Sequence, residues 1–294
     1  MNSATFVFTV LQACHLVAIE QRRIYKGVDD SEGKYPYVVA LIKYYRRGTG
    51  TLIAPNWVLT AARCLTSATH IQFGDMTIPF EVTESKRLVL QTEQPPSTNM
   101  LGPDLGLICV NTVPMKTYAM VSAVDYKVIE GHAVEFAGYG FTQKEWSKDI
   151  ETNFKKDQVR PLQLGSGLAT GCKMNGYLFG PFLCVAPKCS NAEQLTLPGD
   201  PGGPLFYDGK VAAVHIGSQT MSSVRHYTPL SPYLSWIQKV ITTPHKFHVI
   251  QRTRDLNVTS SQDLKNVSNY LYGLKSRVKM YREKLMAVLR RELA

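Results

Sequence analysis

Short apolar runs separated by turns recur through most of the chain, and they constrain its fold more than any other feature. Runs such as YVVALIKY at 37–44, LGLICV at 105–110 and KVAAVHIG at 210–217 are rich in β-branched and aromatic residues. Gly, Pro, Asn and Asp residues separate these runs, as expected for turns between short strands. The pattern predicts an all-β sandwich or a pair of β-barrels, not an alternation of strands and helices.

Helical periodicity is found only towards the C-terminus. In the segment 229–241, five apolar residues fall on one face, which predicts a helix packed against the β body. The polar segment 244–261 is expected to be a linker. Ser260, with Asp263 three residues later, resembles the capping box that begins a helix, here expected over 262–293. The five residues of the first helical face are Tyr233, Leu234, Ile237, Val240 and Ile241.

The second predicted helix carries an apolar seam with alternating steps of three and four residues, which is the heptad pattern. Such a seam needs a partner surface: it folds back onto the β body, binds another chain or a second copy, or lies on a membrane surface. The chain carries a net charge of +10, and the excess gathers in this helix. The charge favours anionic glycans, membrane surfaces or acidic proteins, unless it is simply a solvated helix face. The seam residues are Leu264, Val267, Leu271, Leu274, Val278, Tyr281, Leu285 and Val288.

The N-terminal sequence indicates secretion. Residues 1–18 form an apolar run that is too short to span a membrane comfortably and is typical of a signal peptide. N-glycosylation sequons at Asn257 and Asn266 agree with this interpretation. We therefore expect an extracellular protein without a transmembrane segment. Nucleic acid is not an expected partner, because no nucleic-acid-binding module is recognisable.

Five motifs occur in a fixed order along the chain. They are RRIYKGVDDSEGKYPYVVALI at 22–42, GTGTLIAPNWVLTAARC at 48–64, DLGLICV at 104–110, PGDPGGPLFYDGKVAAVHIG at 198–217 and YTPLSPYLSWI at 227–237. Together they resemble the trypsin-like serine proteases of the chymotrypsin fold, in a secreted invertebrate form. The resemblance covers residues 24–241. It implies two six-stranded antiparallel β-barrels and a terminal helix, within a protease domain over 24–243.

The resemblance also identifies the positions of the catalytic triad. In this family a serine attacks the peptide carbonyl, a histidine accepts its proton and an aspartate orients that histidine. Here the aspartate is Asp104, but Arg63 replaces the histidine and Pro201 replaces the serine. A guanidinium offers no lone pair to a proton, and proline has neither a hydroxyl nor a backbone N–H. Gly199 is then the only inherited donor of the oxyanion hole, and we expect no catalysis by this mechanism.

A displaced catalytic pair is the alternative. Ser218, His215 and His226 lie in segments that line the cleft of the family, but a nucleophile and its base must meet within about 3 Å, and the sequence offers no second motif. His245 and His248 have the spacing of one helix turn. Without a third ligand they are interpreted as surface residues, so no metal and no cofactor is expected.

The primary specificity pocket is predicted to be altered. The alignment places Leu195 at its base and Gly217 at one wall, and it places Arg225 where the opposite wall has a glycine in the family. A long side chain at this position should fill the slot and admit peptide side chains poorly. Arg63 and Asp104 should also lie close enough to form a bidentate ion pair in place of the histidine–aspartate contact.

The activation junction of the family is also recognisable. Cleavage between Arg23 and Ile24, after a short propeptide over 19–23, would free an ammonium group that pairs with the buried Asp200. Because a buried carboxylate without a cation is costly, we predict that this bond is cut. The alternative is an inherited junction that is never cut.

Six cysteines, one of them in the predicted signal peptide, leave an odd number in the mature chain. The resemblance implies a disulfide between Cys172 and Cys184. Gly48 stands where the partner of Cys64 would be, and Cys109 and Cys189 have no inherited partner. A bridge among the remaining three cysteines would leave one thiol that is buried or bridges two chains.

These observations predict a secreted, catalytically inactive serine protease homologue. It would act by binding, as a cofactor or regulator in an extracellular proteolytic network such as an immune cascade or a reproductive fluid. Its expected partner is an extracellular protein, either an active serine protease or the substrate of one. Two alternatives stay open: an active endopeptidase with a displaced triad, and an adaptor that works through the C-terminal heptad helix.

Overall fold

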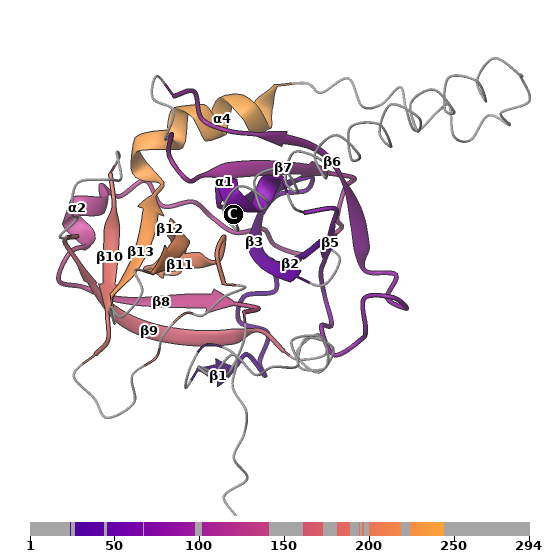
Figure 1. Ribbon diagram of the computed structural model, residues 1–294, viewed down its shortest axis with the longest axis horizontal. Coiled ribbons are helices and arrows are strands. Elements are labelled where there is room, and N and C mark those ends of the chain that lie inside the picture. Colours follow the sequence, from indigo (N-terminus) through magenta and orange to yellow (C-terminus); the bar gives the residue numbers. More distant parts are fainter. Residues whose placement is uncertain are drawn as a thin grey trace, which may run out of the picture. The chain divides into compact units, whose positions relative to one another are not determined.

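A computed structural model shows two β-barrels and a terminal helix (Figure 1). It describes residues 24, 27–43, 46–66, 68–97, 102–140, 161–172, 181–188, 194, 196, 200–218 and 224–243. The predicted all-β architecture of two six-stranded antiparallel barrels is confirmed. The predicted signal peptide and propeptide, the linker, the heptad helix and both glycosylation sequons lie outside the described residues, so these expectations and the domain boundaries stay predictions.

The first barrel is built from the N-terminal half of the chain, coloured indigo to purple in Figure 1. Its strands pair in the closed order β2-β3-β4-β7-β6-β5, and fully buried apolar residues stabilise it, among them Leu52, Leu59, Ile71 and Leu107. The strands are β2 (Val38–Lys43), β3 (Arg46–Ala54), β4 (Trp57–Thr60), β5 (His70–Gln72), β6 (Lys86–Glu93) and β7 (Gly106–Val110). The short helix α1 (Ala62–Leu65) follows β4 directly.

The second barrel closes through β8-β9-β10-β13-β12-β11, and β1 (Val28–Asp29) adds one further strand beside β9. Its core is an apolar cluster that includes Ile24, Phe136, Leu183, Leu205 and Tyr227. The strands are β8 (Ala133–Gly138), β9 (Gln163–Thr170), β10 (Leu183–Ala186), β11 (Pro204–Tyr207), β12 (Lys210–Ser218) and β13 (Arg225–Pro229). Helix α2 (Tyr126–Ile129) precedes β8, and the Asp125 side chain caps it by accepting the Lys127 N–H.

The predicted terminal helix is present. A 3₁₀ turn, η1 (Ser231–Tyr233), leads into α4 (Leu234–Thr242). Of the predicted apolar face, only Ile237 is buried, and the other four residues are partly exposed. The face therefore packs less deeply than the sequence suggested.

Backbone contacts join the two barrels around β3. The Thr49 N–H donates to the Pro201 carbonyl at 3.1 Å, and the Thr49 hydroxyl accepts the Tyr139 N–H at 3.0 Å. Gly202 lies at the same junction with a φ of +90°. A Cβ atom there would overlap the Thr49 carbonyl and the Thr60 hydroxyl, so both conformation and space require glycine. The 200–203 turn is consequently held in place by the first barrel.

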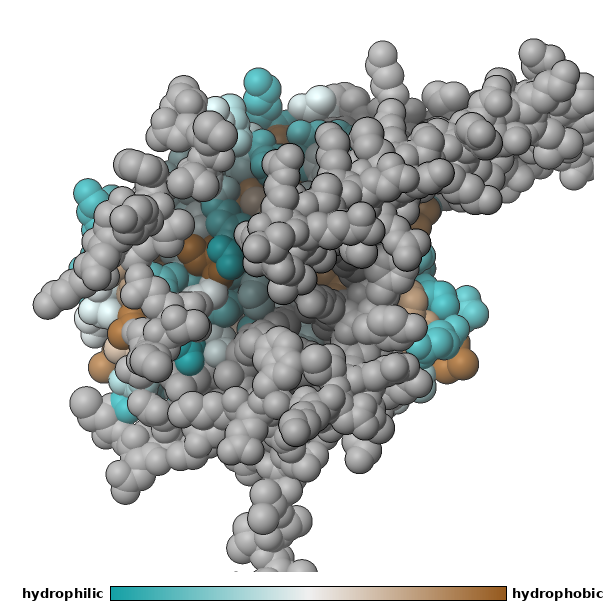
Figure 2. Space-filling model, in the orientation of Figure 1, coloured by the Kyte–Doolittle hydropathy of each residue, from teal (hydrophilic) through white to brown (hydrophobic). Residues whose placement is uncertain are grey.

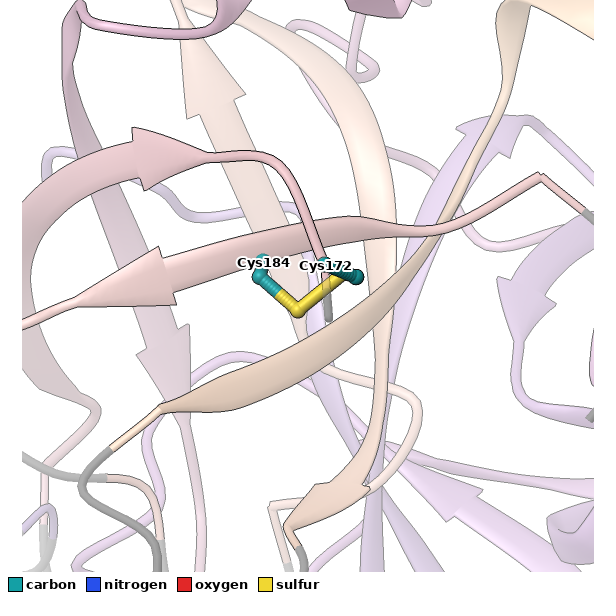
Figure 3. Close-up of a disulfide and its surroundings, with 2 residues drawn as sticks. All are labelled: Cys172 and Cys184. Carbon is teal, nitrogen blue, oxygen red and sulfur yellow. A yellow bond between two sulfur atoms is a disulfide. The ribbon is translucent and has the colours of Figure 1, made fainter. Parts of the chain in front are cut away.

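The predicted disulfide between Cys172 and Cys184 is confirmed (Figure 3). It joins the residue just beyond β9 to the neighbouring strand β10, with a Cα–Cα distance of 5.2 Å. Cys64 and Cys109 are buried thiols, and Cys189 lies outside the described residues. A Cβ atom built on Gly48 would lie 3.4 Å from the Cys64 sulfur, which agrees with the predicted loss of a bridge at this place.

Eight large apolar side chains are exposed in the described part of the chain. On the face shown in Figure 2, both hydrophobic and hydrophilic residues of the described part of the chain are visible. Single exposed apolar residues are normal for a globular domain. A search of the described segments for a helix long and apolar enough to cross a membrane found none. The exposed large hydrophobic residues are Val28, Ile78, Val82, Leu88, Met120, Val124, Val128 and Leu168.

Candidate functional site

Arg63 and Asp104 are brought together by the pairing of β4 with β7. Thr60 lies opposite Gly106 in that pairing, so α1 begins beside the residue that precedes β7. The Arg63 backbone N–H donates to Asp104 Oδ1 at 2.9 Å, and the guanidinium Nε donates to Oδ2. The Asp104 carboxylate is 17% exposed and the Arg63 side chain is 54% exposed. The aspartate thus receives two donors from a single residue, one of them charged.

Replacing Arg63 with alanine is expected to lower the free energy of unfolding by about 1 kcal/mol, because the mostly buried Asp104 loses its charged donor but keeps the backbone N–H. Urea denaturation at pH 7 would measure the change. The exposed cation Lys210 provides the control, since Lys210→Ala removes the same charge without touching a carboxylate in the described structure. A melting temperature equal to that of the wild type would dismiss a stabilising pair.

Pro201 lies beside α1. Its carbonyl accepts the Thr49 N–H, and the thiol of Cys64, the neighbour of Arg63, donates to the same carbonyl at 3.5 Å. The turn that carries Pro201 is fixed on its other side by two bonds of 2.8 Å, from the Gly202 N–H to the His215 carbonyl and from the His215 N–H to the Gly203 carbonyl. The structure therefore gathers Arg63, Asp104 and Pro201 at one place between the barrels.

The two groups of the predicted activation switch are both buried. The Asp200 carboxylate is 1% exposed and accepts the Gly140 N–H at 2.8 Å. Ile24 is wholly buried in the core cluster of the second barrel. Arg23 and the predicted oxyanion donor Gly199 lie outside the described residues.

Arg225, the first residue of β13, is buried. It is 8% exposed, and its Nε donates to the Thr196 carbonyl at 3.2 Å. Gly217 lies on the neighbouring strand β12. A Cβ atom added to Gly217 would lie 3.4 Å from Nη1, a terminal nitrogen of Arg63. Leu195, the predicted base of the pocket, is outside the described residues. Two guanidinium groups therefore lie near the end of β12.

A hydroxyl and an imidazole meet at a place that sequence reasoning missed. Thr196 Oγ1 lies 2.8 Å from His215 Nε2, within the reach required of a nucleophile and its base. Both side chains are 3% exposed, which leaves a substrate little access to them. Burial, followed by the charge of Arg225, lowers the pKa of His215 to about 3, so the imidazole is a very weak base. No short motif links two residues 19 positions apart, so the sequence carried no signal for this contact.

The other candidate groups for a displaced mechanism are also poorly suited to it. Burial raises the pKa of the Cys64 thiol to about 11, so it stays protonated at neutral pH. Burial and the charge of Arg225 lower the pKa of His226. The side chain of Ser218 lies outside the described part of the structure, and so do His245 and His248, the two candidate metal ligands. Within the described ranges no group of three metal-ligating side chains is found.

The buried His215 should make folding sensitive to acid. In the unfolded chain a histidine gains its proton near pH 6.5, whereas in the folded protein His215 stays neutral down to about pH 3. Protons therefore favour unfolding, and stability is lost as the pH falls below 6.5. Between pH 7 and pH 5, the wild type should lose on the order of 2 kcal/mol more than His215→Gln, measured by urea denaturation. Equal losses in the two proteins would show that His215 is protonated without cost.

Comparison with known proteins identifies the family. A family model described as Trypsin matches residues 24–237. The chain belongs to the trypsin family. The match includes Arg63, Asp104 and Pro201, together with both barrels.

Curated relatives in this family are distant but match over most of their length. Trypsin I-P1 of Gallus gallus is 24% identical over 240 residues, covering 75% of this chain and 90% of the relative. Serine protease 1 of Drosophila melanogaster is 25% identical over 233 residues, covering 74% of this chain and 85% of the relative. The trypsin-family domain thus accounts for about three quarters of the chain.

Solved structures share the fold. Neuropsin, a serine protease of mouse brain, gives a TM-score of 0.59 at 21% identity, with 74% of this chain and 100% of the other covered. An inactivated protease paralogue of the scabies mite gives a TM-score of 0.58 at 18% identity, covering 73% of this chain and 98% of the other. At this identity the likeness shows the trypsin-family fold alone.

Proposed function

We propose that this trypsin-family protein is a secreted, catalytically inactive homologue that acts by binding in an extracellular proteolytic network. The observation that carries the proposal is the contact between Arg63 and Asp104. An arginine makes the aspartate contact that a histidine makes in the active members of the family. The expected role is that of a cofactor or regulator, with an active serine protease or the substrate of one as the partner.

For each chemical step of the family mechanism, the group that performs the step is missing. The guanidinium of Arg63 holds no lone pair that could accept the proton of a nucleophile. Pro201 offers no hydroxyl to attack a carbonyl. Because proline also lacks a backbone N–H, one of the two oxyanion donors is missing, a loss that typically costs about a hundredfold or more in rate.

The specificity pocket adds to this interpretation. The buried Arg225 side chain, bonded to the Thr196 carbonyl, occupies the space that a glycine leaves open in the family. Substrate side chains are then excluded from the slot, while the outer surface stays available for a protein partner. The scabies mite structure is named as an inactivated protease, so the fold also occurs in proteins that have lost activity.

Secretion is supported by the apolar N-terminal run and by the Cys172–Cys184 disulfide, because disulfides persist mainly in oxidising compartments. The basic C-terminal segment adds a second route to a partner. In this second candidate function, the protein is an adaptor that works through its heptad seam. Truncation after Thr243 followed by a pull-down from the native fluid tests it, since an adaptor of this kind would lose its partner.

A fluorophosphonate probe, which reacts covalently with activated serines, tests the proposal. The secreted protein should stay unlabelled under conditions in which an active trypsin is labelled completely. Prior treatment with a trypsin-like protease controls for an uncut activation junction. Labelling of the wild type would favour the alternative of a displaced catalytic pair, and peptide mapping would then identify the residue.

We also predict that the bond between Arg23 and Ile24 is cut by a trypsin-like enzyme and that the new ammonium pairs with Asp200. The burial of both Ile24 and the Asp200 carboxylate supports this, because a buried carboxylate is stabilised by a cation. N-terminal sequencing of the protein from its native fluid should begin at Ile24. An intact EQRRIYKG segment in the functional protein would contradict the prediction and favour a junction that is never cut.

A further inference from the structure

We propose that the Arg63 guanidinium is a binding site for a carboxylate group carried by the protein partner. The inference rests on the proposed function, because it assigns the chemistry of the partner to the site where catalysis has been lost. The carboxylate could belong to an acidic side chain or to a chain end, and the chemistry of the contact is the same for both.

The geometry of the ion pair leaves half of the guanidinium available. Asp104 is bonded to the backbone N–H and to Nε of Arg63. Within the described part of the chain, neither of the two terminal nitrogens of Arg63 has a hydrogen-bond acceptor. Each terminal nitrogen carries two N–H groups, so the outer edge can bind a carboxylate with two parallel bonds.

The orientation of this edge is fixed before a ligand arrives. Asp104 holds Arg63 at both its backbone and its guanidinium, so most of the rotamer entropy of the side chain is already lost on folding. Nη1 lies against Gly217 of β12, where the absence of a side chain leaves the guanidinium uncovered. The side chain as a whole is 54% exposed, so a partner can reach it.

The local charge favours an anion. Arg225 lies in β13 directly opposite Ser218, one residue beyond Gly217. Burial is the main reason for the lowered pKa of His215, and the charges of Arg225 and, to a smaller extent, Arg63 lower this pKa further. Two guanidinium groups therefore flank the end of β12, and the Asp104 carboxylate lies on the far edge of one of them.

Other arginines with described side chains do not offer the same site. Arg87 donates from Nε to the Thr112 carbonyl and from Nη1 to the Lys86 carbonyl, and its guanidinium lies over the ring of Phe73. Arg225 is buried. Arg63 combines an occupied inner edge with an exposed outer edge, which is the arrangement of a receptor for a second carboxylate.

Three Gly-Ser peptides with a blocked N-terminus, of which the first two are also blocked at the C-terminus, test the inference by calorimetry on the full-length secreted protein at low salt. The first has one central Asp, the second has Asn in its place, and the third has Asn with a free C-terminal carboxylate. We expect the Asp peptide or the free-acid peptide to bind at least about tenfold more tightly than the neutral one, as a charge-assisted bidentate contact provides. Which acid binds identifies the source of the carboxylate.

The double variant Arg63→Gln, Asp104→Asn removes the site while leaving the net charge unchanged and the hydrogen-bonding capacity of the pair in place. It should bind the acidic and neutral peptides equally. Arg63→Lys keeps the positive charge but lacks the planar guanidinium that can bind a carboxylate with two parallel hydrogen bonds. It should therefore lose most of the preference for the acidic peptides. The matched control Lys210→Ala should keep it, because Lys210 is an exposed cation on another part of the surface.

Equal binding of acidic and neutral peptides by the wild type, or an unchanged preference in the folded double variant, would overturn the inference. These outcomes are independent of the fluorophosphonate experiment. A protein that stays unlabelled but shows no preference for acids would still be an inactive homologue. A labelled protein would overturn the proposed function and the carboxylate site together.

Discussion

A double variant with Arg63→His and Pro201→Ser is expected to react with a fluorophosphonate probe that leaves the wild type unlabelled. Asp104 already accepts the backbone N–H of residue 63 and lies beside its side chain, which is where an orienting carboxylate must be. The serine would restore a hydroxyl and a backbone N–H on a turn that Thr49 and His215 hold in place. Because nucleophile and base act as a unit, the labelling rate should rise by at least about a thousandfold.

Each single variant controls for the other half of the pair. Arg63→His alone has a base without a nucleophile, and Pro201→Ser alone has a nucleophile beside a guanidinium, so both should stay close to the background rate. Arg63→His with Pro201→Ala controls for changes in folding. A folded double variant that reacts no faster than the single variants would contradict the expectation that the surrounding framework still has the geometry of the family.

The double variant with Arg63→His and Pro201→Ser should regain less activity in peptide hydrolysis than in its reaction with the probe. Arg225 is buried, and under the proposed function it fills the slot for a substrate side chain in the double variant as well. Adding Arg225→Gly should therefore raise kcat/KM for peptide substrates while leaving the labelling rate by a small probe largely unchanged. A comparison of the two readouts separates loss of chemistry from loss of substrate binding.

The second large effect concerns stability. Gly48→Cys should form a disulfide with Cys64, because the new Cβ atom would lie 3.4 Å from the Cys64 sulfur. That distance needs only a small adjustment to reach bonding geometry. The bridge would enclose the segment 48–64, and cross-linking a loop of this size stabilises a protein by about 3 kcal/mol. For a domain of this size, the melting temperature should rise by roughly 6–12 °C.

Thiol titration under denaturing conditions would show the loss of the Cys64 thiol, and thermal unfolding with and without a reductant would measure the gain. Gly48→Ser is the matched control, because it adds a side chain of similar size without a sulfur atom. If the oxidised and reduced variant melted at the same temperature, the proposed geometry of the lost bridge would be wrong.

The barrels could be predicted from the sequence because their signals are local. Strands such as 105–110 and 210–217 are each an apolar run bounded by turn residues, and the resemblance of five ordered motifs implied the closure of the sheets. The Cys172–Cys184 bridge followed from the same resemblance. Helix α4 was predicted from its periodicity, although its apolar face is less buried than expected because only Ile237 reaches the core.

The buried polar contacts could not be predicted in the same way. The bond between Thr196 and His215 depends on how a loop is placed against β12, and residue spacing contains no information about that placement. The alignment predicted a pocket position for Arg225, but its bond to the Thr196 carbonyl could be seen only in the structure. The division of the Arg63 guanidinium into an occupied and an exposed edge also became visible only in the structure.

Because Gly202 is tightly enclosed, positions 201 and 202 differ strongly in the range of side chains that they can accept. Position 201 contributes its carbonyl to the barrel junction, and any residue can supply that group. Position 202 is enclosed by Thr49 and Thr60 with a backbone angle that side chains rarely adopt, so almost nothing but glycine can be accommodated. A substitution at position 201 therefore leaves the junction between the barrels intact, whereas almost any substitution at position 202 would force the two barrels apart at this point.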